Sequence, residues 1–306
     1  MADGADGTAD GAGMAEAGAQ TDAHPPGRRR FRHHRRALVG TGVSLLVIGS
    51  ALAAGWLAPR DPIAQEVVAR LQEPGWSDGE GWIAWLGTDH LGRDILSRLV
   101  YGGRVSLLVS LTSVAGSLAL GLVLGLAAGF YGGPAETVIM RLTDLQLAFP
   151  FILLALAIIA LLGPSLPNII IVFTVTSWPI YTRVIRGSVL SLKEIDFVTA
   201  ARALGRPELG ILLRHVTPNV VAPLTVIAFF EVARMIITEA ALGFLGLGVQ
   251  PPTPTWGNML ADGRDYIRDA WWLSAFPGLA IMLTAAGVNL LGDGLRDLLD
   301  PRYQAQ

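Results

Sequence analysis

The chain has 306 residues and a formal net charge of −2, and 52% of its residues are hydrophobic while only 16% are charged. Soluble domains carry about 25% charged residues, so the composition indicates a membrane protein. The near-neutral charge gives no basic field for nucleic acid binding. The absence of cysteine excludes disulfides, thiolate metal sites and cysteine nucleophiles.

The N-terminal segment, residues 1–27, consists mostly of Ala, Gly, Asp and Thr. It offers too little apolar surface to offset the entropy of ordering, and we expect it to be disordered. The run "RRRFRHHRR" at 28–36 follows, directly before an apolar segment. This position is typical of a positive-inside anchor beside membrane lipid, although a site for anionic lipid or nucleic acid is an alternative. Residues 1–36 are therefore predicted to be a disordered, basic, cytoplasmic arm.

Six apolar segments approach the roughly 20 residues that a membrane span needs. They are 37–58, 105–130, 138–162, 168–184, 220–244 and 272–291. The predicted fold is an all-α membrane protein with six transmembrane helices. Six spans place both termini on one side, and the basic run indicates that this side is the cytoplasm. The segment 59–104, in which acidic residues outnumber arginines, then lies outside the cell.

Three glycines of the second span, Gly121, Gly125 and Gly129, are spaced by four residues. This spacing places them on one helix face, where small residues allow a second helix to approach closely. The alternative is that glycine is simply common in membrane helices. The tryptophans fall mostly near predicted span ends, which is typical of an interfacial aromatic belt.

A polar, helix-prone segment, "DFVTAARALGRPELG" at 196–210, separates the fourth and fifth spans. The alanines favour a helix, and Gly205 and Pro207 then interrupt it. Glycine can end a helix in a left-handed turn, and proline suits the start of the next helix. We therefore expect two short angled helices on the cytoplasmic side. They either dock into a groove of a soluble partner or lie on the membrane surface.

Charged residues occur inside two of the predicted spans. Glu231 and Arg234 lie three residues apart in the fifth span, with Glu239 about two turns further on, and Arg141 and Asp144 have the same spacing in the third. Ionisable groups at such depth are costly and usually paired. Glu231, Arg234 and Glu239 are therefore possible contacts for cargo in a transport pathway. The alternative is structural pairing within the helix.

The outer segment contains a cluster of polar residues, Asp89, His90, Arg93 and Asp94. A metal site is conceivable for His and Asp at this spacing, but no metal is predicted. A turn followed by a short helix, capped by Thr88 or Asp89, explains the pattern better. Asp89, Arg93 and Asp94 are also possible contacts with an outer partner.

The segment between the fourth and fifth spans resembles the EAA loop of ABC importer permeases. In that loop a glycine lies four residues after the second alanine and a proline closes the pattern, as Gly205 and Pro218 do here. The resemblance implies a coupling loop over about 186–218 whose helices sit in a cleft of an ATPase subunit. Thr199 stands where the family has glutamate, and Thr217 where it has leucine. The implied ATPase-coupling residues are Asp196, Thr199, Ala200, Ala201, Leu204, Gly205, Arg206 and Pro218.

Four further blocks are similar to permeases of dipeptide, oligopeptide and nickel importers. They are "LGTDHLGRDILSRLVYGGRVSL" (86–107), "DLQLAFPFILLAL" (144–156), "EAALGFLGLGVQPPTPTWGNML" (239–260) and "GLRDLLDPR" (294–302). The resemblance implies a type I ABC importer permease fold in a bacterial inner or plasma membrane. Its parts are a first helix at 37–58, an outer segment at 59–104, a core at 105–302 and a tail at 303–306.

The resemblance also implies the partners and the activity. A second homologous permease completes the pathway, two ABC ATPases bind the cytoplasmic face, and an extracellular substrate-binding protein delivers di- or oligopeptides. The only lysine, Lys193, follows no glycine-rich phosphate loop. The chain is therefore expected to be a non-catalytic subunit without a cofactor, with ATP and Mg on the ATPases. Nickel, glutathione or haem are alternative cargoes, and a membrane enzyme or a sensory or scaffold protein are the rivals from other classes.

Overall fold

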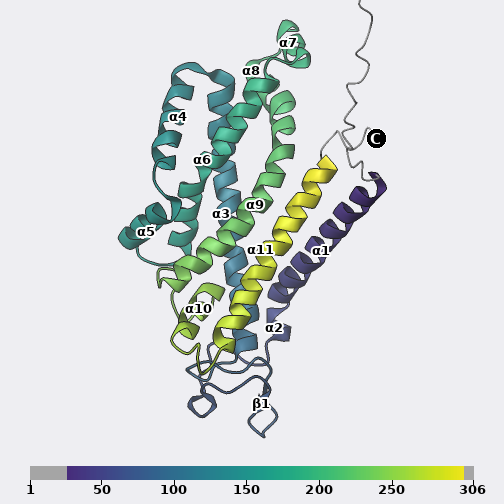
Figure 1. Cartoon of the computed structure of the whole chain (residues 1–306). Coiled ribbons are helices and arrows are strands. Elements are labelled where there is room, and N and C mark those ends of the chain that lie inside the picture. Colours follow the sequence, from purple (N-terminus) through teal and green to yellow (C-terminus); the bar gives the residue numbers. More distant parts are fainter. Residues whose placement is uncertain (1–25, 300–306) are drawn as a thin grey trace, which may run out of the picture.

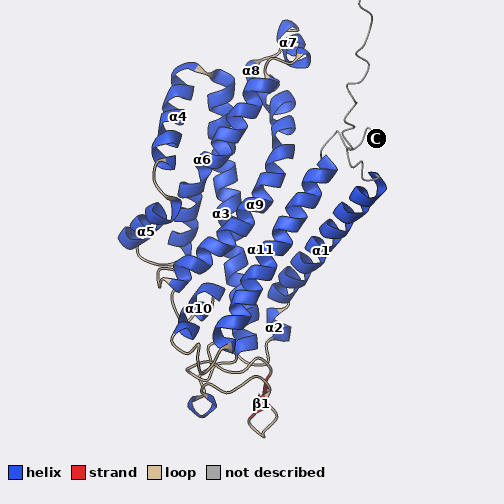
Figure 2. Ribbon diagram, in the orientation of Figure 1, coloured by secondary structure: helices blue, strands red, loops and turns tan. Residues whose placement is uncertain are grey.

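A computed structural model describes residues 26–299 of the chain, and helices make up most of it (Figure 2). Two short strands, β1 (Trp76–Ser77) and β2 (Ile83–Ala84), form an antiparallel pair in which Trp76 faces Ala84. The described part is therefore all-α apart from this hairpin. The helical elements are α1 (Pro26–Leu52), α2 (Ala54–Leu57), η1 (Val67–Ala69), α3 (Ile95–Tyr131), α4 (Gly133–Leu147), α5 (Phe151–Leu162), α6 (Leu166–Leu192), α7 (Asp196–Ala203), α8 (Glu208–Ile211), the π-helical turn η2 (Leu212–Val216), α9 (Thr217–Phe244), α10 (Trp256–Arg264) and α11 (Trp272–Leu299).

The long helices form an elongated bundle with two distinct ends (Figure 1). One, the α7 end, carries α7 and α8 together with both ends of the described chain. The other, the β1 end, carries the connection between α2 and α3. The helices α1 and α11 run side by side along one flank. Both ends of the described chain thus share a side with the predicted coupling loop. Which side of the membrane this is stays a prediction.

Within residues 26–299, three helices are long and apolar enough to cross a membrane, namely α3, α6 and the Trp272–Asp297 part of α11. Two bent pairs, α4 with α5 and the helix on either side of Pro223, bring the number to as many as five. The first predicted span holds a shorter apolar helix, Ala37–Leu52. Every segment predicted as a span therefore contains an apolar helix, but not every one is a straight span.

The third predicted span, 138–162, is not one helix. The axes of α4 and α5 differ by 91°, and α5 lies across the bundle (Figure 1). Pro150 explains the break, because its ring prevents the preceding residue from continuing a helix and it has no N–H to donate. The N–H of Ala148 still bonds to the carbonyl of Asp144, and α5 begins directly after Pro150. Pro223 similarly accompanies a bend of 51° in α9.

One predicted boundary was wrong, and one helix begins earlier than its predicted span. The helix α1 starts at Pro26 and includes the run 28–36 that we expected to be disordered, because arginine favours helices and a helix extends cheaply once nucleated. Residues 1–25 lie outside the described part. The helix α3 starts at Ile95, before the predicted second span begins at 105, because Asp94 caps it by accepting a hydrogen bond from the Ser97 N–H. The predicted outer segment 59–104 therefore ends in helix.

The predicted glycine face of α3 forms the contact with α6. A Cβ atom on Gly121 would lie 2.5 Å from the Cβ of Tyr181, and one on Gly125 would lie 2.7 Å from that of Ile185. Gly129 repeats the pattern against Val189, also at 2.7 Å. Both helices thus contribute residues four apart, so the glycines act in close packing, as predicted. The Thr182 hydroxyl also donates to the Gly121 carbonyl.

Candidate functional site

The predicted coupling loop folds as a helix, a sharp turn and a second helix. α7 ends at Ala203, and Gly205 has a φ of +74°. The N–H of Arg206 bonds to the carbonyl of Ala201, and the N–H of Gly205 bonds to that of Arg202. These two bonds define a Schellman motif, which favours glycine because its left-handed φ costs other residues energy. Pro207 then precedes α8, so the loop has the predicted helix–turn–helix form.

The residues assigned to coupling divide between two faces of α7. Asp196, Thr199 and Ala200 are exposed, whereas Ala201 is buried together with Val198. Ala201 is therefore not accessible to an ATPase in this structure, although the resemblance implied such a contact. Leu204 is 82% exposed. Gly205, Arg206 and Pro218 are also exposed, and Pro218 lies in the first turn of α9.

A charged pair holds the two short helices together. Arg202 donates to both carboxylate oxygens of Glu208 at 2.8 and 3.2 Å. This hydrogen bonding lowers the pKa of the exposed Glu208 carboxyl below its ordinary value. The Thr199 hydroxyl instead donates to the Asp196 carbonyl within the same helix. Three leucines, Leu204, Leu209 and Leu213, remain more than half exposed on this loop.

The charged residues of α9 form two separate sites. Arg234 donates to Glu231 in an ion pair of 2.5 Å, lies 4.6 Å from the ring of Phe151 in α5, and reaches the Ser177 hydroxyl of α6 at 3.4 Å. Its side chain keeps 33% exposure. Glu231 and Arg234 therefore pair within the helix and also meet α5 and α6 at a partly open site.

Glu239, the third predicted pathway residue, lies inside the chain. It is buried and accepts a hydrogen bond of 2.8 Å from Ser106 of α3. The Ser106 hydroxyl in turn accepts from the backbone N–H of Trp256 at the start of α10. This position favours a role in joining α3, α9 and α10 over contact with cargo. The predicted partner of Arg141 also differs, because Asp144 pairs with Arg183 of α6 at 2.6 Å.

At the β1 end, two carboxylates and two guanidinium groups form one network. Arg93 and Arg98 both bind Asp89, and both also bind Asp262 of α10, at 3.1 and 3.0 Å respectively. Burial raises the pKa of the Asp89 carboxyl, but the nearby Arg98 and Arg93 and two backbone amides outweigh it and lower that pKa below its ordinary value. We call these four residues the buried ion network.

The polar cluster at 89–94 has other roles in the structure than those predicted from the sequence. Asp94, not Thr88 or Asp89, caps the following helix. Asp89, His90 and Asp262 hold atoms that could bind a metal within 4.8 Å of one another, but guanidinium groups already neutralise both carboxylates. We therefore assign no metal here. Asp89 and Arg93 are both buried, so neither offers a free surface to an outer partner.

Sequence reasoning missed Arg98 and Asp262. Arg98 lies within the quoted block 86–107, but nothing near it indicates its partners. Asp262 lies 164 residues away, on α10. The network and the coupling loop lie at opposite ends of the bundle (Figure 1). The chain therefore has a charged, closed cluster at one end and an exposed helix pair at the other, with the Glu231–Arg234 site between them.

Comparisons with known proteins identify the family of the chain. Residues 121–305 match the family described as "Binding-protein-dependent transport system inner membrane component". Residues 27–74 match the "N-terminal TM domain of oligopeptide transport permease C". The first of these matches alone covers more than half of the chain. It includes the coupling loop and the Glu231–Arg234 site.

Curated relatives resemble the chain over most of its length. The di/tripeptide transport system permease protein DppC of Pseudomonas aeruginosa is 50% identical over 274 residues, 90% of each chain. The dipeptide transport system permease protein DppC of Escherichia coli K12 is 45% identical over 90% of this chain and 91% of its own. A solved chain of the MetNI methionine ABC transporter superposes with a TM-score of 0.53, at 19% identity, over 66% of this chain and 96% of that one. At that identity the likeness concerns the fold alone.

Proposed function

Since this chain belongs to the binding-protein-dependent transport system inner membrane components, we propose that it works with a second permease, two ABC ATPases and an extracellular substrate-binding protein. The chain is a transport permease of a peptide ABC importer with the type I permease fold. Nickel, glutathione or haem as cargo is not favoured, because the relatives reported above are named for peptide transport. ATP and Mg bind to the ATPases in this proposal, and the chain itself needs no cofactor.

The exposed apolar surface of the coupling loop carries the proposal. Leu204, Leu209 and Leu213 are more than half exposed on this loop, and Ile195 and Phe197 are each 42% exposed. Exposed apolar groups gathered on a small knob are typical of a surface that a groove on a partner covers. ATP binding would draw the two ATPases together and move the coupling loop of each permease as a rigid body. The helices joined to that loop would then separate at the β1 end.

A co-purification experiment tests this docking. We expect Leu204→Asp to lose the ATPase subunits from the purified complex and to abolish peptide uptake, because it places a charge in the apolar contact. Ile267→Asp is the matched control, since Ile267 is an exposed apolar residue near the opposite end. ATPase retained by the Leu204→Asp complex at the level of the control would contradict docking through this surface.

The proposed orientation places the α7 end in the cytoplasm and the β1 end outside. The segment 183–218 supports this orientation, because its basic residues Arg183, Arg186, Lys193, Arg202, Arg206 and Arg214 outnumber its acidic residues Glu194, Asp196 and Glu208. The chain has no cysteine, so single cysteines can be introduced without background. A membrane-impermeant thiol reagent added to intact cells should label Glu80→Cys and leave Arg206→Cys unlabelled. The reverse pattern would contradict the orientation.

We assign the Glu231–Arg234 site to the pathway, where Arg234 attracts the carboxylate of a peptide. Its partial exposure and its contacts with α5 and α6 support this role. Glu231→Gln and Arg234→Gln should each reduce uptake at normal expression. The double exchange Glu231→Arg with Arg234→Glu distinguishes a structural ion pair from a contact with cargo. Peptide uptake would recover if the pair were only structural and would stay reduced if Arg234 contacted cargo. Unchanged transport across several peptides, or recovery by the exchange, would contradict the pathway role.

A further inference from the structure

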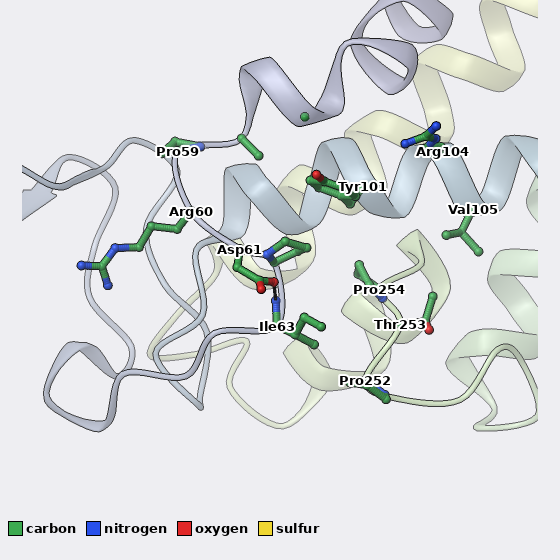
Figure 3. Close-up of a pocket in the computed structure, with 13 residues that line it drawn as sticks. Pro59, Arg60, Asp61, Ile63, Tyr101, Arg104, Val105, Pro252, Thr253 and Pro254 are labelled. Carbon is green, nitrogen blue, oxygen red and sulfur yellow. Dashed lines mark hydrogen bonds between the residues drawn. The ribbon is translucent and has the colours of Figure 1, made fainter.

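A pocket of about 630 Å³ lies near the β1 end, apart from the sites described above. Its walls come from α2 and the chain directly after it, from α3, and from the segment 252–254 before α10. Figure 3 shows Tyr101 and Arg104 on neighbouring turns of α3, with Asp61 and the segment 252–254 on the other side of the pocket. The pocket therefore combines a cation, a carboxylate and a hydroxyl group.

Arg104 is a cation of this pocket that has no ion-pair partner among residues 26–299. Among residues 26–299, no hydrogen bond or ion pair occupies its exposed guanidinium group. Arg60 also lines the pocket, but its guanidinium group lies over the ring of Trp82 at 3.9 Å and near Asp78 at 3.7 Å. Figure 3 shows it directed away from Tyr101 and Arg104. Arg104 is thus free to bind an anion, and the Tyr101 hydroxyl can donate beside it.

The carboxylate of Asp61 provides the opposite charge in the same pocket. Its Oδ1 atom accepts the backbone N–H of Ile63 at 2.9 Å, which fixes the side chain. Within the described part of the chain, Oδ2 has no further partner and remains available to a cation. A ligand that carries both charges would satisfy Arg104 and Asp61 together, whereas a purely anionic ligand would be repelled by Asp61.

The depth of the pocket matches the headgroup region of a bilayer. The 37 residues of α3 span about 55 Å at 1.5 Å per residue, whereas the hydrocarbon core is about 30 Å thick. If the excess is shared between the two ends, the core begins about 12 Å along α3. Arg104 lies about 14 Å along the helix by the same rise. Trp56, 94% exposed and next to the pocket residue Gly55, has the amphipathic ring typical of this layer.

An exposed apolar face of α3 continues from the pocket toward the middle of the bundle. Leu108 and Leu111 follow Arg104 at four and seven residues, so the three lie on one helix face. The two leucine side chains are 49% and 47% exposed. The surface thus changes from charged to apolar along the helix, as the head and the acyl chains of a phospholipid do.

We propose that this pocket binds the headgroup of a zwitterionic phospholipid of the ethanolamine type. The phosphate pairs with the Arg104 guanidinium and accepts the Tyr101 hydroxyl, the ammonium group pairs with Asp61, and an acyl chain lies along Leu108 and Leu111. This ligand matches both the charge pair and the apolar face. The proposal does not depend on the identity of the cargo, because the pocket contains none of the residues assigned to coupling or to the pathway.

Native mass spectrometry of the delipidated importer complex tests the site. The complex is titrated with phosphatidylethanolamine or phosphatidylglycerol of identical acyl chains, and with free phosphoethanolamine. We expect phosphatidylethanolamine to bind most tightly. Arg104→Gln should weaken the binding of both lipids about tenfold, since a charge-assisted hydrogen bond is lost. Asp61→Asn keeps the oxygen that accepts from Ile63 and should weaken only the ethanolamine lipid, so that the preference disappears.

Matched controls and contrary results make the test decisive. Arg268→Gln and Asp269→Asn change exposed charges outside the pocket and should leave lipid binding unchanged. Equal binding by wild type and Arg104→Gln would overturn the proposal. Free phosphoethanolamine binding as tightly as the lipid would also overturn it, because the apolar face would then play no part. Loss of the second permease from the Arg104→Gln complex would show instead that the pocket is a subunit contact.

Discussion

At the β1 end four charged side chains bind one another in or near the interior, whereas at the α7 end the charged side chains lie in the open. Arg98 and Asp89 are 3% and 1% exposed, while Arg202 and Glu208 are about half exposed. Apolar side chains are exposed at both ends, for example Leu204 at 82% on the coupling loop and Ile267 at 60% between α10 and α11. The buried charges of the first end are therefore satisfied within this chain, whereas the charges and leucines of the coupling loop are open to a partner.

The difference concerns how strongly each end is fixed. Removing one partner from a buried ion pair leaves an uncompensated charge and is strongly destabilising. An exposed pair is screened by water and contributes little. The buried ion network joins the segment before α3, the start of α3 and α10, so these three parts should move as one body. The coupling loop depends on a turn and one exposed pair, and substitutions there should affect coupling more than stability.

The largest effect on stability is expected for Arg98→Met. It removes a guanidinium group that binds both Asp89 and Asp262, and the loss should be about 3–5 kcal/mol, as for other broken buried pairs. The thermal unfolding midpoint of the purified complex measures it. Arg264→Met is the control, since Arg264 pairs with Asp265 in the open. Equal midpoints for the two variants would show that the network does not stabilise the β1 end.

Gly205→Pro should have the largest effect on coupling. Proline requires a φ near −65°, whereas Gly205 has +74° and donates its N–H to the Arg202 carbonyl. The turn would be rebuilt, and we expect the amount of peptide taken up per ATP hydrolysed to fall several-fold while the complex still assembles. Gly187→Ala is the control, because a Cβ there meets no atom within 4 Å. Unchanged coupling in Gly205→Pro would mean that the angle of the helix pair is irrelevant.

The pH dependence of stability is expected to reflect the buried ion network at the β1 end. The pKa of Asp89 is lowered in the folded chain, so its contribution to stability is fully present above the ordinary pKa of about 3.9. That contribution is lost as the pH falls through the lowered value. Asp89→Asn should therefore be less stable than wild type at pH 7, and the gap should shrink below about pH 4. Unfolding midpoints measured across this range test it, and a gap independent of pH would contradict the assignment.

Local patterns in the sequence were sufficient for the coupling loop and for most of the bundle. Gly205 and Pro207 indicated the turn, and the spacing of Gly121, Gly125 and Gly129 indicated a face for close helix packing but not α6 as its partner. The buried ion network could not be predicted, because Arg98 meets Asp262 only when α3 and α10 pack together. Hydropathy also concealed the 91° break at Pro150, since both sides of the break are apolar. Asp94, three residues before Ser97, is a typical cap residue and could have indicated the start of α3. Hydropathy instead placed the start of the span at 105, where the apolar run begins.

The smallest effect is expected at Thr199, where the resembled family has glutamate. Its hydroxyl bonds to the Asp196 carbonyl of the same helix, and alanine is a better helix former, so Thr199→Ala should change stability by well under about 1 kcal/mol. A carboxylate is not needed here to hold Arg202, because Glu208 already binds that side chain through both of its oxygens. Glu208→Gln should therefore reduce peptide uptake more than Thr199→Ala does. If Thr199→Ala abolished uptake while Gly205→Pro and Glu208→Gln were silent, the loop would couple through the outer face of α7 and not through the turn that sets its angle.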